Sequence, residues 1–317
     1  MKEKIIIISL VFLSLIVVGI IIIPKLKGEK DNMNIQNNIK NKNIEFDLEK
    51  KEVVLNNGVS MPIIGLGTWT LSNEEAERCT YEAIKAGYRL IDTAQYYGNE
   101  VGVGRGVKKA IEEKIIKRED VFITSKIYAS TNHEAAIQKT LDNLDISYVD
   151  LLLIHQPGSD DEGLYKEMEK FYKDGKIKAL GISNYYTNKE VDEVLSYAEI
   201  APSIIQNENH IYYQNNKLQE YVKDYGILIE SWYPFGGRGH TKESFDNETI
   251  KEIATKYNKS SAQIILRWHL QAGYIVIPGS SNIDHIKENI DIFDFTLSDN
   301  DMDKIAKINK DERYENW

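Results

Sequence analysis

Four residues of the types that move protons in enzymes stand near the ends of short apolar runs. Asp92, Lys126 and His155 each come where such a run ends, and Tyr97 lies in the loop beyond Asp92. In a parallel α/β protein, the carboxyl ends of the strands meet at one edge, where chemistry collects. We therefore expect these four side chains to converge.

The chemistry that this set suits is proton donation by a phenol. A phenol is a weak acid, with a reference pKa of about 10. The ammonium of Lys126 would stabilise the phenolate of Tyr97 and lower its pKa, and the carboxylate of Asp92 would hold that ammonium in place. With His155 beside them, these groups could protonate a carbonyl oxygen that becomes an alkoxide.

Each of the four residues also has a plain structural interpretation. Asp92 could be a turn residue or a helix N-cap, and Lys126 a surface lysine with a buried stem. His155 could be a hydrogen-bonded loop histidine, and Tyr97 a half-buried aromatic. Each residue taken alone favours the structural interpretation, whereas all four at strand ends favour catalysis.

The elements that would position these residues form an alternating pattern from residue 51 to 317. The predicted strands are Ile63–Leu66, Tyr88–Ile91, Val121–Thr124, Leu151–Ile154, Ala179–Ile182, Ile204–Gln206, Ile227–Glu230 and Tyr274–Ile277. Amphipathic stretches between them predict helices, among them Glu74–Ala86, Glu134–Leu144, Leu164–Tyr172, Lys189–Tyr197 and Ala262–Leu270. Without a dinucleotide-binding glycine fingerprint, this order predicts an α/β fold, a (β/α)8 TIM barrel, with an open doubly wound sheet as the alternative.

Two further features concern the start of the barrel domain. Apolar runs flank the turn signal Asn56-Asn57-Gly58, which predicts an N-terminal β-hairpin. Glycines recur at 102, 104 and 106, after Asn99-Glu100 rather than after a strand. We interpret these three glycines as positions where a helix packs closely against its neighbours.

The N-terminal stretch has a different character. Residues 5–23 carry no charge in 19 positions, and a helix of that length spans roughly 28 Å, close to the thickness of a bilayer core. We predict a single N-terminal hydrophobic helix within residues 1–24, an uncleaved anchor in the lipid bilayer rather than a cleaved signal peptide. Residues 25–50 are polar and predict a flexible linker. The predicted location is the membrane, with the catalytic domain in the cytoplasm.

Composition narrows the classes of partner. The formal net charge is −10 and no basic stripe is present, which argues against a nucleic-acid partner. The six histidines and the single cysteine show no metal-ligand spacing, so no metal site is expected.

The motifs around these residues, taken together, resemble the aldo-keto reductase family. They occur in the family's order over about residues 51–311: Gly-Leu-Gly-Thr-Trp (65–69), Asp-Thr-Ala-x-x-Tyr-x-Asn-Glu (92–100), Thr-Ser-Lys (124–126), Leu-Leu-Leu-Ile-His-Gln-Pro (151–157), Gly-Ile-Ser-Asn (181–184) and Ile-Pro-Gly-Ser (277–280). The pattern Ser-Trp-x-Pro at 231–234 is similar to the small-carbonyl and diketogluconate-reductase branch.

This resemblance implies NAD(P)H-dependent reduction of small aldehydes and ketones by a monomer. Tyr97 would be the general acid, supported by Lys126 and Asp92, while His155 would orient the carbonyl. Trp69 and Tyr128 would contact the substrate together with His155. The implied cofactor-binding residues are Gly67, Thr68, Asp92, Ser183, Asn184, Gln206, Trp232, Tyr233, Phe235, Ser280, His285, Glu288 and Asn289.

Within the resemblance, Ser183, Asn184 and Gln206 would hold the nicotinamide carboxamide, and Trp232 would stack on the ring. Two positions depart from the family pattern, because Gly279 and His285 stand where NADPH-binding members have a lysine and an arginine. Both cations that pair with a 2′-phosphate are thus absent or replaced by a mostly neutral imidazole. We expect NADP(H) as cofactor with a weakened preference, and NAD(H) as a second one.

A second hypothesis is that the chain has the same fold but little or no catalytic activity. Folds of this family also serve as regulatory subunits of membrane channels, so the chain could be a membrane-tethered regulatory or binding module. The presence of all four catalytic residues favours the reductase.

Overall fold

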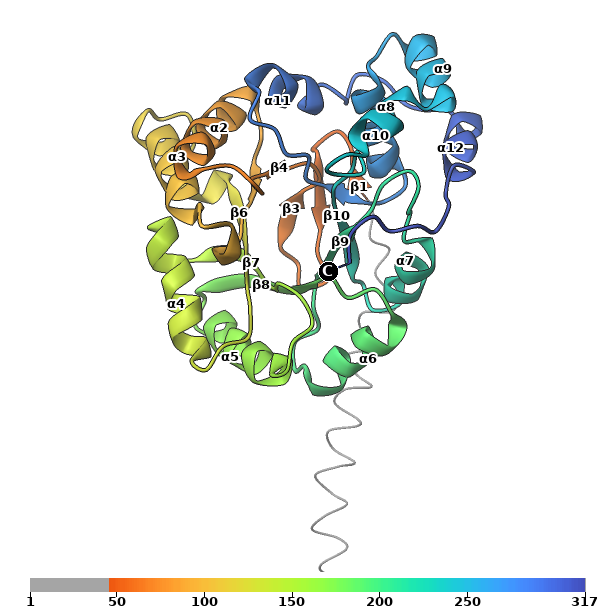
Figure 1. The fold of residues 1–317 in the computed structure, drawn as a ribbon. Helices are drawn as coiled ribbons and strands as arrows, with labels where there is room; N and C mark the ends of the chain where they lie inside the picture. Colours follow the sequence, from red (N-terminus) through yellow and green to blue (C-terminus); the bar gives the residue numbers. More distant parts are fainter. Residues whose placement is uncertain (1–45, 317) are drawn as a thin grey trace, which may run out of the picture. The chain divides into compact units, whose positions relative to one another are not determined.

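The computed structural model describes residues 46–316 of the chain. Eight parallel strands pair in chain order within one sheet, and helices surround them (Figure 1). The strands are β4 (Leu66–Gly67), β5 (Leu90–Asp92), β6 (Phe122–Ile127), β7 (Val149–Ile154), β8 (Ile177–Ser183), β9 (Ile204–Glu208), β10 (Leu228–Trp232) and β11 (Ile275–Val276). Each overlaps or adjoins one of the eight predicted strands.

Backbone hydrogen bonds also join the two ends of this sheet. The amide of Gly65 donates to Val276 over 2.9 Å, and the amide of Val276 donates to Ile63 over 3.1 Å. An isolated parallel bridge pairs Gly67 with Gly279. The eight strands therefore form a (β/α)8 barrel-like fold, and the alternative of an open doubly wound sheet is wrong.

The helices follow the strands along the chain. They are α2 (Asn73–Ala86), α3 (Glu100–Glu112), α4 (His133–Leu144), α5 (Asp161–Lys173), α6 (Asn188–Tyr197), α7 (Asn216–Lys223), α8 (Thr241–Asp246), α9 (Glu248–Tyr257), α10 (Ser261–Gln271), α11 (Ile283–Ile290) and α12 (Asp299–Ala306). Local signals set their ends. At α2, for example, Ser72 forms a capping box with Glu75, and Gly87 ends the helix at φ 105°.

The three glycines of α3 lie where neighbouring elements come very close. A Cβ on Gly106 would stand 2.6 Å from the carbonyl oxygen of Glu77 in α2. A Cβ on Gly102 would be closer still to the backbone oxygen of Asn73, and a Cβ on Gly104 would be closer still to that of Leu144. The prediction of close helix packing at these glycines is confirmed.

The predicted N-terminal hairpin is present as part of a three-stranded sheet. Strands β2 (Glu52–Val54) and β3 (Ser60–Pro62) pair antiparallel around the predicted turn. A short strand, β1 (Phe46–Asp47), pairs with β2 and lies inside the stretch 25–50 predicted as a linker. Regular structure is therefore present before residue 51, because Phe46 and Asp47 gain backbone partners in β2.

The predicted membrane location needs correction. No helix within residues 46–316 is long and apolar enough to cross a bilayer. The prediction depended on the N-terminal helix at residues 1–24, with its span at 5–23, and this helix and the remainder of the linker lie outside the described residues. The location at the membrane is therefore withdrawn.

The barrel strands are buried along nearly their whole length, as expected for parallel strands covered on both faces. Strands β5, β6 and β9 are buried at every position. Polar residues among them are thus placed in the interior, where each needs a partner.

Candidate active site

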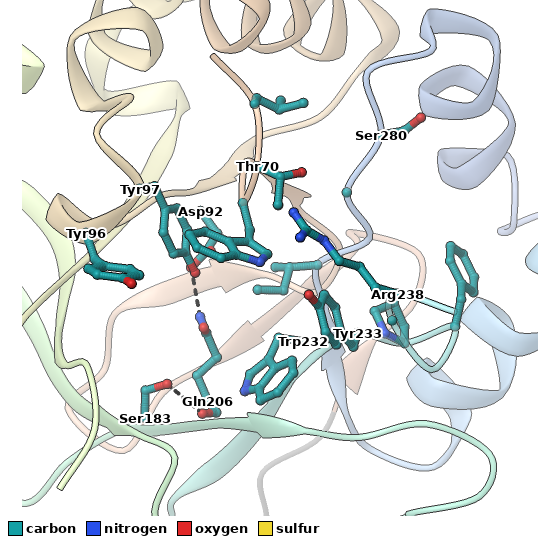
Figure 2. A pocket seen from close by; sticks show the side chains of 18 of the residues that line it. Thr70, Asp92, Tyr96, Tyr97, Ser183, Gln206, Trp232, Tyr233, Arg238 and Ser280 are labelled. Carbon is teal, nitrogen blue, oxygen red and sulfur yellow. Dashed lines mark hydrogen bonds between the residues drawn. The ribbon is translucent and has the colours of Figure 1, made fainter. Parts of the chain in front are cut away.

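A cavity of about 320 Å³ opens at the carboxyl ends of the strands (Figure 2). Thirteen of the predicted site residues line it: Gly67, Trp69, Asp92, Tyr97, Tyr128, His155, Ser183, Asn184, Gln206, Trp232, Tyr233, Phe235 and Ser280. These residues come from every part of the barrel sequence, so the barrel-like fold brings them together.

Lys126 joins Tyr97 to Asp92 beneath this cavity. Its ammonium donates to Asp92 Oδ1 over 2.6 Å, to the carbonyl oxygen of Thr93 over 2.9 Å, and lies 3.1 Å from the Tyr97 hydroxyl. Lys126 and Asp92 are each only 1% exposed. A buried lysine with a carboxylate and a phenol as neighbours is the arrangement predicted from the sequence.

The loop that carries Tyr97 is fixed by buried hydrogen bonds. Asn99 donates to the carbonyl oxygens of Thr68 and Leu71, over 2.8 and 3.0 Å. Glu100 accepts from Ser125 Oγ over 2.7 Å, which ties the start of α3 to β6. The Asn-Glu pair of the sequence motif therefore ties the segment after the 3₁₀ turn Gln95–Tyr97 to β6 and to the loop that follows β4.

Burial changes the acidity of this group of residues. It raises the pKa of Tyr97 to about 12, although the charge of Lys126 acts in the opposite direction. The predicted net lowering is therefore wrong. Burial alone would lower the pKa of Lys126, but the charges of Asp92 and Tyr97 and their hydrogen bonds together raise it to about 12. Tyr97 is a protonated phenol and Lys126 a cation across the ordinary pH range.

His155 lies against the phenol as a neutral ring. The ring centroids of Tyr97 and His155 are 5.7 Å apart, in a T-shaped arrangement. Burial, followed by the charge of Lys126, lowers the pKa of His155 to about 3. Tyr128 stacks on the imidazole at 4.6 Å. A neutral imidazole retains one N–H, which can donate a hydrogen bond into the cavity.

Three polar residues, Ser183 at the end of β8, Asn184 directly after it and Gln206 on β9, line the cavity. Gln206 Nε2 donates to Asp92 Oδ2 over 2.7 Å, and Ser183 Oγ donates to the backbone oxygen of Gln206 over 2.9 Å (Figure 2). Asn184 has a φ of 67° and donates through Nδ2 to the His155 carbonyl oxygen over 2.9 Å. The amide side chains are thus held by the same groups that surround Tyr97.

Not every predicted residue reaches the cavity wall. Thr68 is fully buried, and its Oγ1 donates to the Asp92 carbonyl oxygen over 2.8 Å. His285, Glu288 and Asn289 lie on α11, outside the residues that line the cavity. Their assignment to a cofactor remains a prediction.

Other residues at the site were missed from the sequence. Tyr96 and Arg238 line the cavity, and Glu230 accepts a hydrogen bond from Gln206 behind it. Tyr96 could have been found, since it adjoins Tyr97 in the same loop. Arg238 lies in a glycine-rich loop of no regular pattern, and the apolar run that predicts the strand Ile227–Glu230 gives Glu230 no role in the site. Within residues 46–316, no group of three acidic, histidine or cysteine side chains could hold a metal ion.

Comparisons with known proteins agree with this geometry. The model of the aldo/keto reductase family matches residues 63–310. The chain is 46% identical over 270 residues to glyoxal reductase from Bacillus subtilis, covering 83% of this chain and 95% of that protein. It is 39% identical over 297 residues to NAD(P)H-dependent D-xylose reductase I,II from Candida tropicalis, covering 81% and 91%.

A solved structure is similar as well. The crystal structure of a Bombyx mori aldo-keto reductase in complex with NADP superposes with a TM-score of 0.79 at 32% identity, covering 84% of this chain and 94% of that one. The chain belongs to the aldo/keto reductase family. The predicted family is confirmed, and with it, at the level of the family, NAD(P)H-dependent carbonyl reduction and the NADP(H) cofactor.

Proposed function

We propose that this chain reduces aldehydes and ketones to alcohols, with Tyr97 as the general acid. The reaction makes it an oxidoreductase that acts, in the reverse direction, on CH–OH groups. The observation that carries the proposal is the contact of the Tyr97 hydroxyl with Lys126 at the floor of the cavity, 3.1 Å apart. The named relatives are reductases, which favours catalysis over the alternative of a regulatory or binding module.

Proton donation follows from the charges around the phenol. Tyr97 keeps its proton until the carbonyl oxygen gains negative charge, because burial disfavours the phenolate. Once the proton has left, the ammonium of Lys126 stabilises the phenolate. Asp92 keeps the ammonium in place throughout. Because the phenolate is stabilised in this way, Tyr97 can give its proton to the alkoxide that forms.

Neighbouring side chains would orient the carbonyl compound. The neutral ring of His155 donates its N–H to the carbonyl oxygen and so points that oxygen at Tyr97. Trp69 packs on Tyr97 at 4.8 Å, and Tyr128 packs on His155. These aromatic walls exclude water from the reacting atoms and suit small carbonyl compounds.

The residues that line the remainder of the cavity fit a nicotinamide cofactor. Gln206 uses its amide nitrogen on carboxyl oxygens, which leaves the amide oxygen as an acceptor for a carboxamide N–H. Trp232 lies half-buried at the cavity wall, where it can stack on an aromatic ring. When bound, the reduced nicotinamide supplies the hydride. Backbone groups of Tyr233 and Phe235 would contact the pyrophosphate.

The cofactor preference is the finer part of this proposal. A Cβ at Gly279 would lie 3.0 Å from the carbonyl oxygen of Gly67, so glycine suits this bridge between β4 and the segment after β11. His285 is exposed on α11. Without a lysine and an arginine at these positions, we propose that NADP(H) and NAD(H) are both used, with Ser280 as a remaining phosphate ligand and Glu288 and Asn289 at the adenine.

The experiment is an assay of the purified protein with NADPH or NADH and a panel of small aldehydes. We expect the absorbance of the reduced nicotinamide to fall with both cofactors. No turnover with any carbonyl compound would contradict the proposed function. Sedimentation of the same sample tests the further proposal that the protein acts as a monomer.

A further inference from the structure

Glu230 is a buried acid with too few partners for a carboxylate. It lies on β10, is 0% exposed, and is paired in register with Gln206 on β9. Its Oε2 accepts from Gln206 Nε2 over 2.7 Å, while Oε1 has no hydrogen-bond partner within residues 46–316. An ionised carboxylate can accept about four hydrogen bonds, so a charge here would be poorly solvated.

The position of Glu230 determines how the Gln206 amide is turned. The terminal nitrogen of Gln206 lies 2.7 Å from Asp92 Oδ2 and 2.7 Å from Glu230 Oε2. Two acceptor oxygens on either side select the NH2 end of the amide, because an amide oxygen there would face two other oxygens. The amide oxygen is thereby left for the cavity, which Gln206 lines.

The charges in this part of the barrel balance only if Glu230 is neutral. Among residues 46–316, the positive charge that acts on Glu230 is that of Lys126 on β6, which is paired with Asp92 on β5 at 2.6 Å. On its other side, β11 places the apolar Ile275 opposite Glu230. Burial, followed by the charge of Asp92, raises the pKa of Glu230 to about 8.

We propose that Glu230 is a positioning residue that, as a neutral acid, holds the Gln206 amide nitrogen on Asp92 and turns the amide oxygen toward the cofactor. Loss of the proton would place a second negative charge beside Asp92 and close to the nicotinamide whose carboxamide Gln206 would hold. Because the oxidised nicotinamide is a cation and the reduced one is neutral, ionised Glu230 favours the oxidised cofactor. This part of the inference rests on the proposed function, whereas the charge state of Glu230 does not.

The charge state is tested on the cofactor-free full chain. A carboxyl whose pKa is raised on folding stabilises the fold at low pH, and that stability is lost as pH rises from the unfolded value of about 4.5 through about 8. We expect the Tm of the wild type to fall by several degrees relative to Glu230→Gln between about pH 6 and about pH 9. Glu220→Gln, at an exposed acid on α7, is the control and should leave the pH dependence of Tm as it is in the wild type.

An identical pH dependence of Tm in the wild type and in Glu230→Gln would overturn the proposal that Glu230 is a neutral acid. The infrared band of a protonated carboxyl, present in the wild type and absent in Glu230→Gln, provides an independent measurement.

The positioning role is tested by cofactor binding, followed by the quenching of protein fluorescence. Glu230→Leu removes the acceptor, and we expect about tenfold weaker binding of NADPH, restored by Glu230→Gln. In the wild type, the ratio of NADP+ to NADPH affinity should rise with pH through about 8, and it should stay constant in Glu230→Gln. Equal affinities in Glu230→Leu and the wild type would refute the positioning role. Absence of binding by the wild type would refute both the positioning role and the proposed function, and the Tm measurement would still decide the charge state.

Discussion

Two regions of the active site differ in how closely their surroundings fix them. Asp92, Lys126 and Glu230 are at most 1% exposed and are joined through hydrogen bonds that cross the barrel. Gly279 and His285 form the rim, the end of the site proposed for the adenosine, and both are exposed. A change in the interior removes a partner from a buried charge, whereas a change at the rim alters one contact with the ligand. The interior therefore determines whether the reaction occurs, and the rim determines which nucleotide takes part.

The largest effect is expected where a charge is left without its partner. Lys126→Met should lower kcat by about 10³-fold, since the phenolate loses its cation. It should also destabilise the fold by ~3–5 kcal/mol, because Asp92 becomes an unpaired buried charge. Asp92→Asn added to Lys126→Met should restore much of the stability but none of the rate. Chemical denaturation and steady-state kinetics measure the two effects, and recovery of the rate in the double variant would contradict the role of Lys126.

His155 provides a prediction on pH within the same interior. Its pKa of about 3 lies below the ordinary range, so the ring is neutral at every pH above about 4. The rate of carbonyl reduction should therefore show no step from imidazole ionisation between about pH 5 and pH 8. A step near pH 6.5 that disappears in His155→Gln would show that the ring titrates there and would contradict the neutral imidazole.

At the rim, a restored cation should change selectivity rather than rate. His285→Arg places a guanidinium where the 2′-phosphate is expected, and a bidentate contact should tighten NADPH binding about tenfold. NADH binding should be unchanged, because that cofactor lacks the phosphate. Gln138→Arg on α4 adds the same charge at a distant, exposed position and serves as the control. Equal tightening of both cofactors would place the phosphate elsewhere.

The smallest effect is expected at Arg238, an exposed cation that lines the cavity. Water and salt screen such a charge, so Arg238→Ala should weaken cofactor binding only about two- to fivefold, and less at high salt. Lys217 is also an exposed cation, on α7, and Lys217→Ala is the control variant. A loss of a hundredfold would mean that Arg238 replaces the missing phosphate-binding cations.

The sequence predicts the interior better than the rim. Strand positions follow from continuous apolar runs, and Asp92, Lys126 and His155 follow because each ends such a run. The direction of the shift in the pKa of Tyr97 could not be predicted, since it depends on burial that only the closed fold provides. Glu230 was missed for a related reason, because an acid at the end of a strand has the pattern of a surface residue. Arg238 lies in a loop with left-handed glycines at 236, 237 and 239, which no periodicity describes.

The central claim is that Tyr97 gives its proton to the carbonyl oxygen, and one variant tests it most directly. In Tyr97→Phe, which removes a single oxygen, kcat should fall by at least about 10²-fold while the Kd of NADPH stays within about twofold. Tyr221→Phe removes a hydroxyl that is bonded to Asp192 at the surface, and it should leave both values unchanged. A Tyr97→Phe protein that turns over aldehydes at the wild-type rate would contradict the claim.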